Sequence, residues 1–351
     1  MGNKKQKRIV NAWAFYDWAN SVYPLVITTA IFPLYYTAVT SGNKEMVGDF
    51  EADVVYFFGI RFVNTALYSY ITAASFLVVA FASPILSGVA DYIGNKRFFL
   101  SLFCYIGSSA CIGLFFFDPG FLEFSMLLPF FASIGYWGSM VFYNAYLPEI
   151  APPEDHDKIS ARGFTMGYIG SVLLLVANLV AIQAFGMPAK WAFITVGIWW
   201  AGFAQITLTY LPENPYNHRV KKKESLVKKG FLELQSVWKQ LKNQIPLKRY
   251  LGAYFVYNMG VQTVMLMAIL FANKEIQWPI NPETGQPDTA GLIIAVIIIQ
   301  LLASVGAFVM SRLSKKVGNI MVLKVVVFLW ILLCVFAYFI HTPTEFYLLA
   351  A

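Results

Sequence analysis

Long apolar runs separated by short polar connections dominate the chain from end to end. A run of roughly 20 apolar residues, in helical form, crosses the hydrocarbon core of a membrane. The runs are continuous and do not alternate between apolar and polar positions, which favours membrane-spanning helices over barrel strands. A tenth run begins near Thr344, so the chain is expected to be partial at Ala351. Nine complete spans are predicted near Ala19–Val39, Leu67–Ser87, Phe98–Phe117, Phe124–Tyr146, Phe164–Phe185, Trp191–Leu211, Tyr250–Ala272, Ala290–Met310 and Val317–Ile340.

Composition and charge support a membrane protein with a defined orientation. The chain is 58% hydrophobic and 13% charged, which is more apolar surface than a water-soluble core of this length can bury. Its cations gather in alternate connections, as the positive-inside rule requires, so the N-terminus and the central loop are expected to be cytoplasmic. This sidedness accounts for the net charge of +7, and no nucleic-acid binding is inferred from it. The cation-rich segments are Lys4–Arg8, Lys96–Arg97, Arg219–Arg249 and Arg312–Lys316.

The central loop divides the chain into three parts. Residues 1–211 are predicted as an N-terminal six-helix bundle, 212–249 as a basic cytoplasmic loop, and 250–351 as an incomplete C-terminal bundle. Apolar residues of the loop recur at helical spacing with lysines on the other faces, which predicts an amphipathic helix at the membrane surface. This helix is either a tether between bundles or an element that senses lipids or a partner. Its apolar positions are Val227, Phe231, Leu234, Trp238, Leu241 and Ile245.

Two connections carry related polar sequences. Gly88–Arg97 joins the second and third spans, and Ser311–Asn319 joins the eighth and ninth. A loop repeated once is typical of a chain made of two similar membrane halves, and this predicts a transporter. In the second copy Lys315 stands where the acid would be. The polar residues of the first copy are Asp91, Gly94, Lys96 and Arg97.

Three stretches of the first half carry a family resemblance. They are Trp13–Tyr23, Ser83–Asp91, and Phe142–Ile150 continued by Ser160–Gly163 and Gly167–Gly170. Together with the repeated loop they resemble the major facilitator superfamily, and more narrowly its vacuole effluxer family, the autophagy-related and bacterial "unknown major facilitator" group. The resemblance weakens after Arg249. It implies alternating access by two bundles around a central site, amino acids as a substrate class, and the bacterial inner (plasma) membrane.

In such a mechanism the polar loop after the second span would latch the cytoplasmic side. Asp91 would accept charge-assisted hydrogen bonds or face a helix N-terminus, and Gly94 would permit a tight turn. Lys96 and Arg97 would hold the cytoplasmic surface. The same charges can be explained as topogenic signals alone. Because Lys315 replaces the acid in the repeat, a latch is expected to depend on Asp91 more than on the repeat.

Asp17 is the principal candidate for a functional site. An ionisable group at the edge of a span is costly and is a functional candidate for that reason. It could bind a cation, carry a proton or pair with a cation during gating, with a proton or sodium gradient as the energy source. The alternative is an interfacial acid beside an aromatic belt of Trp13, Tyr16 and Trp18.

Further candidates lie on the helices that the resemblance places around the cavity, namely the first, fourth, seventh and tenth. Asn258 and Gln262 are four residues apart and share a helix face. These groups would contact solute, although hydrogen bonds between helices explain them as well. The scarcity of charge in these helices favours a small neutral or zwitterionic solute. The candidates besides Asp17 are Asn20, Ser21, Tyr23, Tyr136, Trp137, Tyr143, Asn144, Tyr257, Asn258 and Gln262.

Other classes of function find little support in the sequence. It contains no nucleotide-binding loop and no HExxH motif, so an enzyme is not expected. Its cysteines lie in predicted spans and its histidines lack metal-ligand spacing, so no metal and no cofactor are expected. We expect a monomeric secondary transporter whose partners are a solute and membrane lipids. The alternative is a transport-incompetent receptor or scaffold of the same fold.

Overall fold

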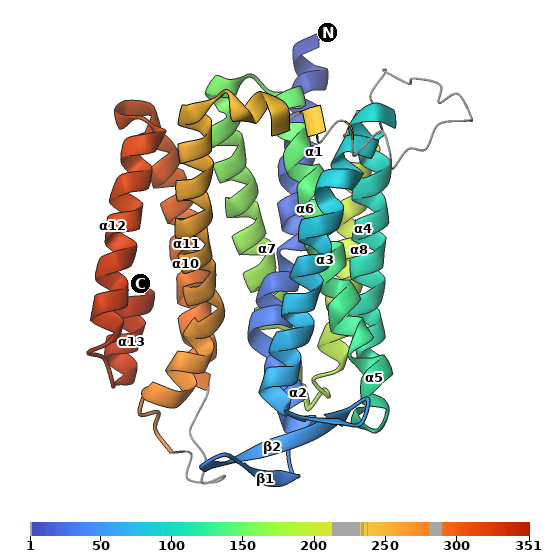
Figure 1. Ribbon diagram of the computed structural model, residues 1–351, viewed down its shortest axis with the longest axis vertical. Helices are drawn as coiled ribbons and strands as arrows, with labels where there is room; N and C mark the ends of the chain where they lie inside the picture. The colour runs from blue at the N-terminus through green and yellow to red at the C-terminus, as the bar shows by residue number, and fades with distance from the viewer. Residues whose placement is uncertain (1, 94, 213–231, 233–234, 237, 281–289) are drawn as a thin grey trace.

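The computed structural model describes residues 2–93, 95–212, 232, 235–236, 238–280 and 290–351. Long helices form most of the described chain and run along a common direction (Figure 1). In chain order they are α1 (Gly2–Asn20), the π-helix η1 (Tyr23–Ile31), α2 (Phe32–Val39), α3 (Asn64–Ile93), α4 (Lys96–Gly113), α5 (Leu122–Ser125), α6 (Leu127–Ile150), α7 (His156–Phe185), α8 (Trp191–Tyr210), α10 (Ile245–Glu275), α11 (Ala290–Val317), α12 (Asn319–Ala337) and α13 (Pro343–Ala350).

Eight helical segments in the described part of the chain are long and apolar enough to cross a membrane. They correspond to eight of the nine predicted spans, and the remaining one, Tyr250–Ala272, falls within α10. The predicted helical integral membrane protein with many spans is therefore confirmed. The predicted amphipathic helix of the central loop lies largely outside the described residues.

The helix α13 begins where the sequence predicts the tenth span. Thr342 and Glu345 form a capping box at its start, in which each side chain accepts a hydrogen bond from the other's backbone. The backbone N–H groups of His341 and Thr342 both donate to the Glu345 carboxylate. The capping box therefore fixes the point at which α13 begins.

The helix that leads into the first span begins well before the predicted start of that span. The sequence predicts the span from Ala19, whereas α1 begins at Gly2 and a helical segment that contains the span runs from Lys4 to Val39. Pro24 lies at the first turn of η1, where its missing N–H interrupts the ordinary helical hydrogen bonding. The segment that resembles the family signature consequently lies inside the bundle and not at its edge.

A small antiparallel sheet, which the sequence does not predict, joins α2 to α3. Its strands are β1 (Lys44–Val47), β2 (Phe50–Phe57) and β3 (Ile60–Val63), in that order. Phe58 and Gly59 both have positive φ, 50° and 75°, which is the backbone of a tight hairpin turn. The Phe58 N–H donates to Glu123 Oε1 of α5 at 3.0 Å, so the hairpin tip is tied to a separate connection.

The helices have two chemically distinct ends. The N-terminus, the α3–α4 connection and the α11–α12 connection lie together at one end, and the sheet lies at the other (Figure 1). We name these the basic end and the sheet end. We also name α1 to α8 the first half and α10 to α13 the second half. The arrangement agrees with the alternation of cation-rich connections along the sequence.

Close helix contacts in the first half depend on glycine. Gly135 of α6 meets Gly107 of α4 so closely that a Cβ at position 135 would overlap the backbone at position 107. A Cβ at Gly107 would also meet the Trp200 ring of α8. Small residues of this kind let helices approach in a membrane, where hydrophobic burial gives no advantage to association. The contact joins α4, α6 and α8 into one packed unit.

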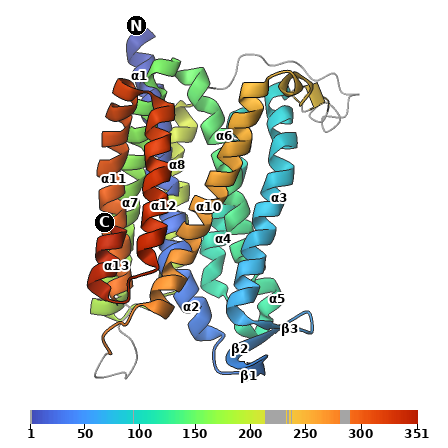
Figure 2. The ribbon, with the colours of Figure 1, turned by 60° about the vertical axis from the view of Figure 1, so that its left-hand side comes forward.

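The two sides of the chain bury separate apolar clusters. The larger cluster belongs mainly to the first half and includes Trp13, Phe32 and Trp200, and the smaller one joins Trp278 and Phe346 of the second half. Figure 2 shows α10 inclined to the other long helices of the bundle. Each predicted bundle thus contains most of one cluster. The boundaries of the two bundles stay a prediction.

Replacing Gly135 with Ala is expected to lower the free energy of unfolding by about 1–3 kcal/mol, because the added methyl group collides with backbone that cannot move aside. Thermal unfolding in detergent measures the effect, followed with a thiol-reactive dye that reports on buried Cys104 and Cys111 in a Cys334→Ser background, because Cys334 is exposed. Gly202→Ala is the matched control, since a Cβ there meets open space. Equal melting temperatures for the two variants would contradict the close contact between Gly135 and the backbone of α4.

Candidate functional site

Asp17 lies in the interior of the first half. It is 4% exposed and accepts a hydrogen bond from the Tyr143 hydroxyl of α6 at 2.8 Å. Among the described side chains it is the one Asp or Glu in the buried class. The aromatic residues predicted to form an interfacial belt around it are largely buried as well: Trp13 stacks on Tyr143 at 4.3 Å, and Tyr16 is fully buried. Asp17 is thus a packed interior acid.

A glycine face of α7 makes room for this part of α1. A Cβ at Gly163 would fall on Asp17 Oδ2 and crowd the Tyr143 hydroxyl. One turn later, a Cβ at Gly167 would meet Ser21 Oγ, which lines the same contact. Both glycines belong to a stretch that carries the family resemblance. Their spacing of four residues is the sequence signal for this close contact, and the sequence analysis assigned them no role.

A second polar contact lies one turn further along α1. Asn20 is fully buried, and its Nδ2 donates to the Met140 Sδ of α6 at 3.1 Å. Ser21 Oγ donates to Asn20 Oδ1 at 3.5 Å. The ring of Tyr23 packs against that of Tyr136 with centroids 5.1 Å apart. The structure therefore brings the predicted residues of the first and fourth spans together as helix contacts.

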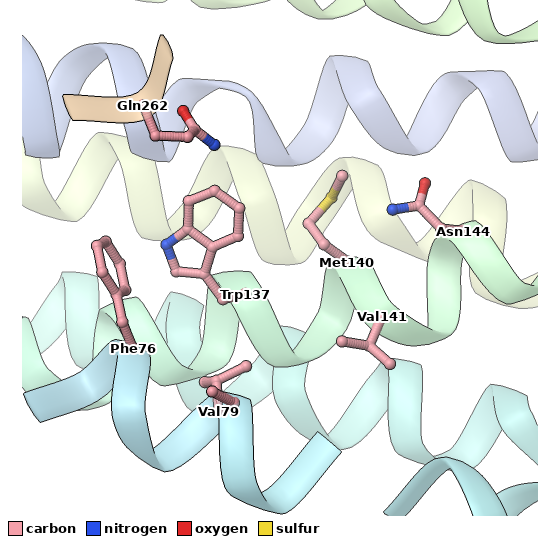
Figure 3. A pocket seen from close by; sticks show the side chains of 8 residues that line it. Phe76, Val79, Trp137, Met140, Val141, Asn144 and Gln262 are labelled. Carbon is pink, nitrogen blue, oxygen red and sulfur yellow. The ribbon is translucent and has the colours of Figure 1, made fainter. Parts of the chain in front are cut away.

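A cavity of about 440 Å³ opens between α3, α6 and α10. Three of the predicted site residues line it: Trp137 and Asn144 from α6, and Gln262 from α10 (Figure 3). The other lining side chains are apolar, namely Phe76, Val79, Ala80, Met140 and Val141. The Phe76 and Trp137 rings meet edge to face with centroids 5.6 Å apart. No charged group is among the described residues that line the cavity, and both halves contribute to its wall.

The remaining predicted residues of α10 lie apart from this wall. Tyr257 and Asn258 are half-buried, and the Tyr257 ring packs edge to face on Tyr254 at 5.3 Å. Gln262, one turn after Asn258, is the member of the predicted pair that reaches the cavity.

The basic loop after α3 makes its described contacts within the first half. Lys96 pairs with Glu149 of α6 at 2.6 Å, and Arg97 donates to the Leu211 carbonyl at 3.4 Å. The side chain of Asp91 and residue 94 lie outside the described part of the structure, so the roles predicted for Asp91 and Gly94 stay predictions. Lys96 and Arg97 fasten the start of α4 to the ends of α6 and α8.

A polar contact at the basic end joins the two halves through the repeated loop. Ser314 Oγ donates to Asp157 Oδ2 of α7 at 2.8 Å, and Asn319 Nδ2 donates to Asp157 Oδ1 at 3.5 Å. Farther along α7, Thr165 Oγ1 donates to the Ser304 carbonyl of α11 at 3.4 Å. The repeated loop thus contributes a contact between the two halves at the basic end.

Three functional candidates escape sequence reasoning. Asp157 looks like an ordinary connection acid, and Glu149 follows Pro148 without any sign of its partner Lys96. Met140 sits in an apolar run and gives no signal at all. Within the described residues, no group of three or more His, Cys, Asp or Glu side chains is arranged to hold a metal ion.

Comparison with known protein families identifies a family for nearly the whole chain. The family profile described as "Vacuole effluxer Atg22 like" matches residues 5–351. The chain belongs to this family. The resemblance in the first half thus extends over the second half as well.

Among relatives in this family, an uncharacterized MFS-type transporter of Bacillus subtilis, YxiO, is 28% identical over 97% of this chain and 75% of its own length. Autophagy-related protein 22-1 of Penicillium rubens is 23% identical over 81% of this chain and 57% of its own. The crystal structure of a bacterial homologue of the human lysosomal transporter Spinster, inward-facing and unoccupied, has a TM-score of 0.52 at 19% identity. The superposition covers 89% of this chain and 63% of the Spinster homologue, and it shows that the two proteins share a fold.

Replacing Asp157 with Asn is expected to loosen the basic end, because a hydrogen bond to a neutral amide is weaker than one to a carboxylate by about 1 kcal/mol. In a background without the native cysteines, a membrane-impermeant maleimide should label Thr165→Cys roughly fivefold faster in the Asp157→Asn variant. Asp155→Asn, an exposed acid two residues away, is the control. Unchanged labelling of Thr165→Cys would show that the Asp157 contact does not hold the halves together.

Proposed function

We propose that this chain forms the solute-handling part of a secondary transporter that moves a small solute by alternating access. The observation that carries the proposal is the cavity of about 440 Å³ built from α3 and α6 of the first half and α10 of the second. A site shared by two halves changes its access when one half moves against the other. Membership of a family with MFS-type transporters supports the same conclusion.

The lining of the cavity favours a small neutral or zwitterionic solute with an apolar body. Phe76 and Trp137 offer an aromatic corner, and Met140 extends it along α6 (Figure 3). The amides of Asn144 and Gln262 supply hydrogen-bond donors and acceptors without net charge. Amino acids with apolar side chains meet this description, and we propose them as the substrate class.

We propose Asp17 as the coupling group, with a proton as the coupled ion. A carboxyl group in the bundle interior is costly as a lone charge, and protonation removes that cost. Hard cations take several oxygen ligands, whereas the polar partner that the described residues give Asp17 is the Tyr143 hydroxyl. A proton needs one site on the carboxylate. This favours proton coupling over sodium coupling.

The Asp17→Asn variant is expected to lose uptake driven by a pH gradient by about tenfold or more, because an amide cannot exchange a proton at this position. Uptake and counterflow of radiolabelled L-leucine in proteoliposomes measure the two processes separately, and counterflow should persist. Asp49→Asn, at an exposed turn of the sheet, is the matched control. A pH-driven response that survives in Asp17→Asn refutes Asp17 as the coupling group. No flux of leucine or other neutral amino acids by the unmodified chain would favour the receptor or scaffold alternative.

We also propose that the basic end faces the cytoplasm of a bacterial inner membrane. The cations of the N-terminus and of the loop before α4 support this orientation. In intact cells, an impermeant maleimide should label Asp49→Cys at the sheet end and spare Lys5→Cys at the basic end. The opposite result would invert the proposed orientation.

A further inference from the structure

The side-chain amide of Asn20 makes weak or long hydrogen bonds, and its backbone carbonyl lacks the usual helical one. The side chain is fully buried, and its Nδ2 donates to the thioether of Met140 at 3.1 Å, a weak acceptor. Its Oδ1 receives the long contact of 3.5 Å from Ser21 Oγ. The backbone carbonyl of Asn20 cannot receive the usual helical bond from residue 24, because Pro24 has no N–H. A buried amide is expected to hold better partners than these.

Met140 separates this amide from the cavity. It lines the cavity between Trp137, one turn before it on α6, and Asn144, one turn after it (Figure 3). Its sulfur is at the same time the acceptor for Asn20. Methionine is unbranched with three rotatable bonds, so its side chain can change position without a movement of the helix. The Met140 side chain is therefore a thin and adaptable part of the wall.

We propose that Asn20 is a covered polar subsite of the cavity, and that Met140 uncovers it when a solute binds. The solute would place a carbonyl or carboxylate oxygen on Asn20 Nδ2, in place of the thioether, and its apolar body beside Phe76 and Trp137. This inference rests on the proposed function in one respect, that the cavity holds the solute. A carboxylate oxygen makes the stronger bond, because the hydrogen bond is then charge-assisted.

The position of the subsite also connects solute binding to the buried acid. Asp17 and Asn20 are three residues apart on α1, and Met140 and Tyr143 are three apart on α6, so each pair shares a helix face. The two contacts between these helices, Asn20 with Met140 and Asp17 with Tyr143, are therefore neighbours. A solute oxygen at Asn20 would displace the first contact directly beside the second.

Accessibility of a cysteine at position 20 tests whether Met140 covers the subsite, without any knowledge of the solute. In a background without the native cysteines, a small methanethiosulfonate reagent should label Asn20→Cys slowly. Labelling should be about tenfold faster when Met140→Ala is added, and unchanged when Met140→Leu, a residue of similar size, is added. Val22→Cys, also fully buried and directly before η1, is the control and should stay protected in both. Equal rates with and without Met140→Ala, or equal acceleration of Val22→Cys, overturn the proposal.

A second experiment tests the chemistry of the ligand with Asn20 in place. Val141→Cys reports on the cavity, and protection from the reagent by L-leucine is compared with protection by isoamylamine, which has the same apolar body and amine but no carboxylate and no other oxygen. Asn20→Ala should raise the protecting concentration of leucine about tenfold and leave that of isoamylamine unchanged. Equal shifts for both solutes, or none, overturn Asn20 as the oxygen subsite. If neither solute protects Val141→Cys, the proposed substrate class is wrong, while the labelling of Asn20→Cys still decides whether Met140 covers the amide.

Discussion

The packing of the first half depends on the hydrogen bond between Asp17 and Tyr143. A carboxyl group inside a membrane bundle is tolerated when it is neutral or hydrogen-bonded, and the 2.8 Å contact with the Tyr143 hydroxyl provides such a bond. The space for this pair exists because Gly163 has no side chain. Three helices, α1, α6 and α7, therefore meet at one buried acid. Asp17 keeps its hydrogen bond because α6 brings the Tyr143 hydroxyl to it and α7 leaves the space at Gly163.

The helix α6 serves two environments with different faces. Phe142 and Tyr143 belong to the buried core, whereas Trp137 and Val141 line the cavity. Met140 takes part in both, because it lines the cavity and also contacts Asn20 of α1. The periodicity of the helix thus brings the wall of the cavity within one turn of the buried acid pair. A movement of the Met140 side chain in the cavity therefore changes its contact with Asn20, which lies next to the hydrogen bond between Asp17 and Tyr143.

The spans and their alternation could be predicted from the sequence, because each membrane helix satisfies its own backbone and leaves a long apolar run as its mark. Asp17 was also identifiable, since an acid at the edge of such a run is conspicuous. The partners were not: Tyr143 lies 126 residues from Asp17, and Ser314 lies 157 residues from Asp157. Met140 could not be singled out, because an apolar residue in an apolar run carries no signal until the helix face is known. The strands β1 and β3 are four residues long and too short to show a pattern.

The hydrogen bond from the Phe58 backbone to Glu123 has a mechanical consequence. It links the connection between α2 and α3 to α5, which precedes α6. The ends of these three spans are thus joined outside the long helices, where separation would otherwise meet the least resistance. A movement that separates α3 from α6 at this end would have to break the hydrogen bond between Phe58 and Glu123. The sheet end of the first half is therefore held by a contact between its connections as well as by the packing of its helices.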